Sequence, residues 1–404
     1  MPQVDSPYVE FEDCWSGYDP EKTVIQPHYL NCYLKRPSCE FELTPTEYGA
    51  CVKLSFKKDL RRYISVLPVS HYCEYTYEPE TARLYCMTEC NRGIADHDKG
   101  IIKGYYVFQF DKNSVDIEEI LTGNRNTCDT KHSLTTKCEN TGIHIALKEK
   151  DVTFTVATSF ISYEQAVRNL EHDSVYNSFD ELKAENERIW NEYLGKIEID
   201  ADEDTMKTFY SCMYRTFLYP HKAYEPDENG KPIHYSPCAD KVLPGVRYTD
   251  NGFWDTYRTV YPFFALVAKE ELREMLTAFI YEYKESGWLP RWLSIGECGC
   301  MPSTLVDAVI ADGAVKGFID EPTLRVALEG MLKHSVTNPP ESRFGRNGAE
   351  SYCKYGYVPY DEQKESVNLT LDAAYGDWCI AEIAKILGES KIEKEYRKRA
   401  TYYK

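Results

Sequence analysis

The sequence contains no CxxC pair among its 15 cysteines and no apolar run that approaches the roughly 20 residues of a membrane-spanning helix. Its first residues also lack the basic and apolar regions of a signal peptide. Without paired cysteines a zinc site is disfavoured, and many thiols persist most easily in a reducing compartment. We therefore expect a cytoplasmic protein with no membrane partner, in which most cysteines act as small buried hydrophobic residues.

Positive charge is also scarce. The chain has 47 lysines and arginines against 65 aspartates and glutamates, which gives a formal net charge of −18. Phosphate binding requires clustered basic residues, so nucleic acid is excluded as a partner and a neutral or cationic ligand is favoured. A length of 404 residues exceeds what one compact core usually holds, so we expect two lobes.

The first lobe is predicted to be an antiparallel β-sandwich. Between Tyr29 and Ile161 the apolar residues alternate in several short runs separated by turn-forming residues. Period-two alternation of this kind is typical of antiparallel strands with one buried face. We assign residues 1–177 to this sandwich domain.

The periodicity changes at Ser178, which is followed by Glu181 at the spacing of a capping box. The pattern that follows predicts a connecting helix over residues 178–200, which we expect to lie along the seam between the lobes. Its predicted buried stripe consists of Leu182, Ile189, Trp190 and Tyr193.

Residues 201–404 are predicted to form the helical second lobe, with no strands between the helices. Successive amphipathic helices indicate an α/α layer architecture, which leaves a bundle, a solenoid or a closed toroid open. The expected helices cover residues 205–219, 253–268, 270–285, 303–318, 322–336, 365–387 and 390–404.

Three motifs in this lobe are typical of a sugar pocket: GFWDTYR, GWLPRW and IGECGCM. A pyranose has an apolar C–H face that suits an indole, and hydroxyls that require fixed hydrogen-bond partners. Trp254 and Asp255 supply one group of each kind. The alternative is that Trp254 is a core residue and Asp255 a helix N-terminal charge, behind a cap region that contains Asp250 and Asn251.

Arg258 lies one helical turn after Trp254 and Asp255, where it could contact the sugar or form a salt bridge with Asp255. In the third motif, Gly299 would let the backbone approach a ligand closely, and the small Cys300 would leave room for it. The sequence offers no nearby histidine to activate the cysteines, so a reactive thiol is disfavoured.

Several further acids of this lobe are candidate site residues. Glu297 is either a hydrogen-bond partner for a sugar hydroxyl or a solvated loop charge. Asp307 and Asp312 are separated by five residues, which does not place them on one helix face, so a structural role is favoured for both. Glu365 lies at a helix start, as a capping acid would.

The segments GFWDTYRTVYPFFAL, SGWLPRW, GCMPSTLVDAVIADGAVKG and GYVPYDEQKESVNLTLDAAYGDWCIAEIAK resemble glycoside hydrolase family 92, and the likeness extends over nearly the whole chain. Members are calcium-dependent exo-acting α-mannosidases. The resemblance implies an α+β fold of two lobes, in which an N-terminal β-sandwich precedes an (α/α)6 toroid. It also implies removal of terminal α-linked mannose, with α-1,2 linkages as the expected target, from N-glycans or mannan by a calcium-assisted inverting mechanism.

In the family, the general acid, the base and the calcium ligands lie in motifs of the types EGNxWQY, NEPxHH and GNDDxG, which this sequence does not contain. We therefore assign no catalytic residue and no metal ligand, and we expect an incomplete toroid that is inactive alone but belongs to an active full-length enzyme. The resemblance implies substrate-binding roles for Trp254, Asp255, Arg258, Glu297, Cys300 and Met301. One alternative is a non-catalytic mannose-binding remnant; another is a glucosidase, trehalase-like hydrolase or phosphorylase with the same toroid.

Overall fold

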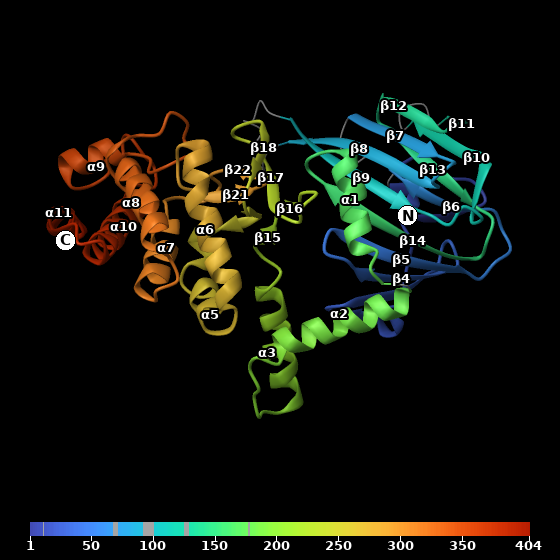
Figure 1. The fold of residues 1–404 in the computed structure, drawn as a ribbon, viewed down its shortest axis with the longest axis horizontal. Coiled ribbons are helices and arrows are strands. Elements are labelled where there is room, and N and C mark those ends of the chain that lie inside the picture. Colours follow the sequence, from blue (N-terminus) through green and yellow to red (C-terminus); the bar gives the residue numbers. More distant parts are fainter. Residues whose placement is uncertain (11, 68–71, 92–100, 125–128, 177) are drawn as a thin grey trace. The chain divides into compact units, whose positions relative to one another are not determined.

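A computed structural model describes residues 1–404 except 11, 68–71, 92–100, 125–128 and 177 (Figure 1). The chain divides into two units, of which the first comprises Met1–Cys90 and Ile101–Glu198 and the second contains Ile199–Lys404. Within the described ranges, no helix has the length and apolar character needed to cross a membrane.

The first unit contains two antiparallel sheets. The smaller sheet has the strand order β1 (Pro2–Val4), β6 (Arg62–Val66), β13 (Thr141–Leu147), β10 (Val115–Asn124) and β11 (Thr130–His132). The larger sheet has the order β12 (Thr135–Glu139), β7 (Tyr72–Glu78), β8 (Arg83–Asn91), β9 (Ile101–Gln109), β14 (Asp151–Ser159), β5 (Gly49–Phe56), β4 (Cys39–Pro45), β3 (Tyr29–Leu34) and β2 (Val24–Gln26).

Apolar side chains from both sheets form one core. The smaller sheet contributes the fully buried Ile143 and Ile145 of β13, and the larger sheet contributes Leu54 and Leu84. Ile143 and Ile145 are two residues apart in β13 and therefore lie on the same face of the strand, as the period-two pattern of the sequence predicts. This confirms the predicted β-sandwich.

Two helices follow the last strand of the sandwich. Helix α1 (Tyr163–Asp173), which the sequence analysis did not predict, packs Ala166 and Leu170 against β9 and β14. Helix α2 (Phe179–Leu194) has the predicted cap, because the Ser178 side chain accepts the N–H of Glu181 at 3.2 Å.

Only the first part of α2 is buried. Leu182 packs in the sandwich unit beside Tyr29, and Asn186 donates to Pro45 at 2.7 Å. The predicted burial of Ile189 is wrong, since its side chain is exposed. The other two residues of the predicted stripe, Trp190 and Tyr193, are half-buried.

The second unit is mainly helical (Figure 1). Its largest core is formed by α5, α6, α7, α8, α10 and α11, through residues such as Phe279, Val309, Met331 and Ile380. Its helices are α3 (Glu203–Thr216), α4 (Phe253–Thr256), α5 (Val260–Val267), α6 (Lys269–Ser286), α7 (Val306–Val315), α8 (Glu321–Val336), α9 (Ala349–Tyr355), α10 (Ser366–Ile386) and α11 (Ser390–Arg399).

The expectation of a helical lobe without strands is wrong. Short antiparallel strands lie between α3 and α7, where turns at Gly230 and Gly245 have positive φ angles. The strands are β15 (His221–Lys222) paired with β19 (Tyr248–Thr249), then β16 (Glu225–Pro226), β17 (Pro232–Ser236) and β18 (Lys241–Pro244), and finally β20 (Asn251–Gly252), β21 (Trp292–Ser294) and β22 (Gly296–Glu297).

Two predicted helix extents also differ from the structure. The helix expected over residues 253–268 is broken between α4 and α5, where the β-branched Thr256, Thr259 and Val260 disfavour a continuous helix. The helix expected to reach residue 404 ends at Arg399, and the chain then turns so that Tyr402 packs against another tyrosine ring.

Charged side chains meet in the interior of the second unit. Asp307 of α7, His334 of α8 and Asp377 of α10 are fully buried. Arg346 lies between the aspartates, 2.9 Å from Asp307 Oδ2 and 2.7 Å from Asp377 Oδ1. Arg399 of α11 donates from Nε to Asp377 Oδ2 at 2.8 Å. We call these five residues the buried ion network; in it, two guanidiniums balance two carboxylates.

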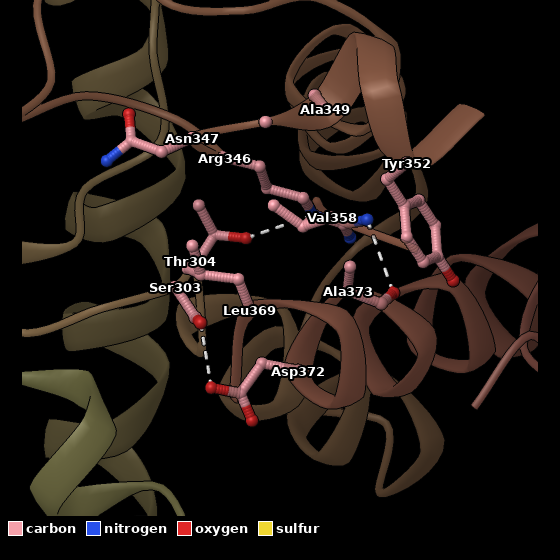
Figure 2. A pocket seen from close by; sticks show the side chains of 11 residues that line it. Ser303, Thr304, Arg346, Asn347, Ala349, Tyr352, Val358, Leu369, Asp372 and Ala373 are labelled. Carbon is pink, nitrogen blue, oxygen red and sulfur yellow. Dashed lines mark hydrogen bonds between the residues drawn. The ribbon is translucent and has the colours of Figure 1, made fainter. Parts of the chain in front are cut away.

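Neighbouring charges decide the protonation of this network. Burial alone would raise the pKa of Asp307, but His334 and Arg346 beside it hold this pKa below its usual value. Burial lowers the pKa of His334, whose Nε2 donates to Asp307 Oδ2 at 3.1 Å. Arg346 also donates to Thr304 Oγ1 at 3.2 Å and to the carbonyl oxygen of Ala373 at 3.3 Å (Figure 2).

Asp307 and Asp312 provide a matched test of the network, because both lie on α7. Asp307→Asn removes the buried charge that faces Arg346 and should lower the free energy of unfolding by about 3–5 kcal/mol. Asp312 is 36% exposed and pairs with Lys316 at the surface, so Asp312→Asn should cost less than about 1 kcal/mol. Urea unfolding followed by circular dichroism measures both; equal losses would contradict the structural role of Asp307.

Candidate functional site

The tryptophan and aspartate pair lies on the single turn of α4. Phe253 is fully buried in the core, whereas Trp254 is 42% exposed and Asp255 is exposed. The alternative that Trp254 is a core residue is therefore excluded. An exposed indole beside an exposed carboxylate is the arrangement that the sugar-pocket hypothesis requires.

Two local contacts considered around α4 are not formed. The helix has no side-chain cap from Asp250 or Asn251. Within the described part of the chain, Arg258 makes no ion pair with Asp255; its Nε donates to the Tyr257 hydroxyl at 2.5 Å, and its guanidinium lies 5.1 Å from that ring. No described residue donates a hydrogen bond to the Asp255 carboxylate, which is thus open to a ligand.

Strand pairing brings two of the motifs together. Gly252, directly before α4, pairs with Trp292 across β20 and β21. A Cβ at Gly252 would lie only 2.0 Å from Trp292 Nε1, so a residue with a side chain cannot stand there without displacing the indole. The motif GFWDTYR therefore lies beside GWLPRW.

Glu297 is buried, with 3% of its surface exposed, which excludes the solvated-charge alternative. Its Oε2 accepts the backbone N–H of Arg291 at 2.7 Å, and its Oε1 accepts those of Trp292 at 3.0 Å and Gly299 at 2.8 Å. Burial raises the pKa of Glu297 to about 7, against the opposing effect of these N–H groups. The carboxyl group thus organises the loop around itself.

Arg291 holds the rest of the loop. Arg291 donates to the carbonyl oxygens of Ser342 at 2.5 Å and Met301 at 2.6 Å. Gly299 has a φ of +58°, and a Cβ there would lie 2.4 Å from the Cα of Arg343. Gly299 therefore lets the backbone of Arg343 come close, whereas the sequence had predicted a close approach to a ligand.

A cavity of about 270 Å³ opens beside Glu297. It combines an indole, three carboxyl groups and a guanidinium, which could hold a ligand with several hydroxyls. Of the six residues proposed from the sequence, only Glu297 lines it, while Cys300 is exposed and Met301 half-buried on the adjoining loop. The lining residues are Pro237, Cys238, Glu285, Ser286, Trp288, Gly296, Glu297, Pro340, Glu341, Arg343 and Phe344.

Sequence reasoning missed three charged residues of this cavity: Glu285, Glu341 and Arg343. Glu285 lies in the last turn of α6, and the other two follow α8, about 55 residues further along the chain. The GWLPRW motif marked the nearby Trp288, but no local pattern links these segments.

Two further acids, Glu365 and Asp372, lie at the start of α10 and within it. Glu365 precedes α10 as its N-cap residue but makes no side-chain capping hydrogen bond, so the expected capping role is wrong. Asp372 accepts a hydrogen bond from Ser303 at 2.7 Å (Figure 2), and burial raises its pKa. Among the residues that the structure describes, no three His, Cys, Asp or Glu side chains are placed to hold a metal ion.

Comparison with known protein families identifies the family of this chain. The glycosyl hydrolase family 92 catalytic domain matches residues 165–404, which include both tryptophan motifs and the cavity. The chain belongs to glycosyl hydrolase family 92.

Solved structures agree with this assignment. A family GH92 inverting mannosidase from Bacteroides thetaiotaomicron VPI-5482 is 31% identical, with a TM-score of 0.92 over 100% of this chain and 54% of that chain. A family GH92 alpha-mannosidase from Bacteroides thetaiotaomicron is 23% identical, has a TM-score of 0.86 over 100% of this chain and 55% of that chain, and supports the fold alone. The predicted two-lobe fold is confirmed.

A curated relative is more distant. An uncharacterized secreted glycosidase of Arthroderma benhamiae is 25% identical over 260 residues, which are 61% of this chain and 29% of that protein. The chain thus spans about half the length of the solved relatives and less of the fungal one.

The raised pKa of Glu297 predicts a pH dependence of stability. Because the folded pKa of about 7 exceeds the unfolded value of 4.5, the proton stabilises the fold below about pH 4.5, and this contribution is lost as the pH rises through 7. The stability advantage of wild type over Glu297→Gln should therefore shrink by about 3 kcal/mol between pH 4 and pH 8. Urea unfolding at several pH values measures this difference, which a solvated carboxylate would leave almost constant above pH 5.

Proposed function

We propose that this protein, as a full-length enzyme, removes terminal α-linked mannose from glycans, with α-1,2 linkages in N-glycans or mannan as the target. The likeness of the entire chain to an inverting mannosidase carries this proposal. The exposed indole and carboxylate on α4 support it, because they suit the two faces of a pyranose. The family assignment disfavours the other toroidal hydrolases and phosphorylases.

In this proposal the described residues hold the sugar rather than cleave its bond. Trp254 would pack on the C–H face of the ring, and Asp255 would accept hydrogen bonds from ring hydroxyls. Arg258, on the same exposed surface, would contact the glycan beyond the terminal sugar. Cys300 and Met301 would form the neighbouring wall.

An inverting glycosidase needs an acid and a base, with roughly 6.5–9.5 Å between their carboxyl groups. Glu297 and Asp307 do not suit either role, since backbone N–H groups occupy the first and His334 and Arg346 the second. We therefore assign no catalytic residue in this chain, and we expect it to bind sugar without turnover when isolated.

Calcium is part of the proposal for the full-length enzyme. A hard cation suits hydroxyl and carboxylate oxygens and would supply a grip on the ring hydroxyls of the substrate. The described residues offer no cluster of three acidic, histidine or cysteine ligands, so they do not fit such a site by themselves. Its ligands would come from the parts of the family domain that this chain does not span.

The alternative is a non-catalytic protein that binds mannose. The open carboxylate of Asp255 and the exposed Trp254 suit binding without turnover equally well. Full-length protein that binds mannobiose but never hydrolyses it would favour this alternative.

Substitution of Asp255 tests the role assigned to it. In the full-length enzyme, Asp255→Asn should lower kcat/KM on α-1,2-mannobiose roughly ten- to a hundredfold, because one charged hydrogen bond is worth about 1.5–3 kcal/mol. Folding and calcium binding should be unchanged. Glu270→Gln, at the exposed first turn of α6, is the control and should retain full activity. A loss of many orders of magnitude with unchanged binding would instead make Asp255 a catalytic carboxylate.

Metal removal tests the calcium proposal. Treatment of the full-length enzyme with EDTA should abolish mannobiose hydrolysis, and added Ca²⁺ should restore it. Mg²⁺ should restore little, since it is smaller and demands a tighter octahedral shell. Full activity after exhaustive chelation, checked by elemental analysis, would contradict a calcium-dependent mechanism.

A further inference from the structure

The turn between β21 and β22 carries a backbone conformation that its residue disfavours. Ser294 pairs with Gly296, which leaves Ile295 alone at the tip of the turn with a φ of +57°. A β-branched residue is rarely found in the left-handed region, because its side chain crowds the backbone there. Such a conformation persists only where surrounding groups hold it.

Two side chains form hydrogen bonds with the backbone of Ile295, one with its N–H group and one with its carbonyl oxygen. The Thr249 hydroxyl accepts the N–H of Ile295 at 2.6 Å, and Arg247 donates from one terminal nitrogen to the Ile295 carbonyl oxygen at 3.0 Å. Thr249 belongs to β19 and Arg247 directly precedes this strand, so one short segment holds both the N–H and the carbonyl group of Ile295. We call Arg247 and Thr249 the turn clamp.

Arg247 is itself held by ion pairs. It is 3% exposed, and its other terminal nitrogen donates to Glu282 at 2.5 Å and lies 3.4 Å from Glu285, both on α6. His234 of β17 places Nε2 2.9 Å from Glu285 and Nδ1 2.9 Å from the carbonyl oxygen of Gly245. His234 thus connects Glu285, behind the turn clamp, with the turn at Gly245.

The turn leads directly into the candidate site. Gly296 and Glu297 follow Ile295 and both line the cavity, as does Glu285 behind the clamp. Glu297 in turn accepts the N–H of Gly299, at the centre of the glycine and cysteine loop. A change in the turn would therefore move the wall of the cavity.

We propose that Arg247 and Thr249 are positioning residues, which hold Ile295 in its left-handed conformation and thereby fix the cavity wall formed by Gly296 and Glu297. The importance of this wall for sugar binding rests on the proposed function. The order of the wall does not, so it can be measured without any ligand.

Hydrogen exchange followed by mass spectrometry tests this proposal on the whole chain. Arg247→Lys keeps a positive charge near Glu282 but loses the fork that reaches the carboxylate and the Ile295 carbonyl together. Exchange of the amides in residues 293–299 should become at least about tenfold faster, as expected when a disfavoured backbone conformation is released. Arg273→Lys is the matched control, because Arg273 of the same helix as Glu282 also donates to backbone carbonyls, and it should leave these amides unchanged.

A glycine at position 295 shows whether Arg247 acts on the backbone conformation of Ile295 or only stabilises the fold as a whole. Glycine adopts a φ of +57° without crowding, so Ile295→Gly in the Arg247→Lys background should return exchange of residues 293–299 to near the wild-type rate. If Arg247→Lys does not fold, Thr249→Val replaces it, since this change removes one clamp contact without touching the ion pairs. Unchanged exchange in the variants, or faster exchange that Ile295→Gly does not reverse, would overturn the proposal. Faster exchange that Ile295→Gly reverses, with mannose binding by the full-length protein unchanged, would support the positioning role and overturn only its link to the proposed function.

Discussion

The second unit depends on a set of charges buried away from water. Asp307 and Asp377 each lie against guanidinium groups, so α7, α10 and α11 are tied together by contacts that solvent does not weaken. A buried pair of this kind is costly to form and still more costly to break on one side, which makes the arrangement of these helices specific. Arg346 also holds Thr304, and thereby fixes the chain just after the glycine and cysteine loop.

The two carboxyl groups of the candidate site, those of Glu297 and Asp255, have different roles. Glu297 is buried among backbone N–H groups and gives its loop a shape, whereas Asp255 is exposed and has no described partner. Accessibility and unused hydrogen-bonding capacity distinguish a ligand-binding acid from a structural one. Trp254, also exposed, belongs with Asp255 on these grounds.

Local signals of the sequence predicted much of the fold. The alternation of the sandwich strands, the Ser178 cap and the separate environments of Asp307 and Asp312 all follow from spacing within a few residues. The same local signals failed where distant segments decide the outcome. Arg346 and Arg399 approach the aspartates only through helix packing, and the strands around Gly252 form only because residues 292–294 fold back onto them. The burial of Glu297 likewise depends on this tertiary pairing.

The central claim is that the exposed pair on α4 holds the sugar. A crystal structure of the full-length enzyme with a bound, slowly hydrolysed α-linked mannoside tests it most directly. The ring of the terminal mannose should pack against Trp254, and at least one of its hydroxyls should donate to Asp255. A mannoside bound only in the cavity between Glu285 and Glu297, with Trp254 and Asp255 untouched, would contradict it.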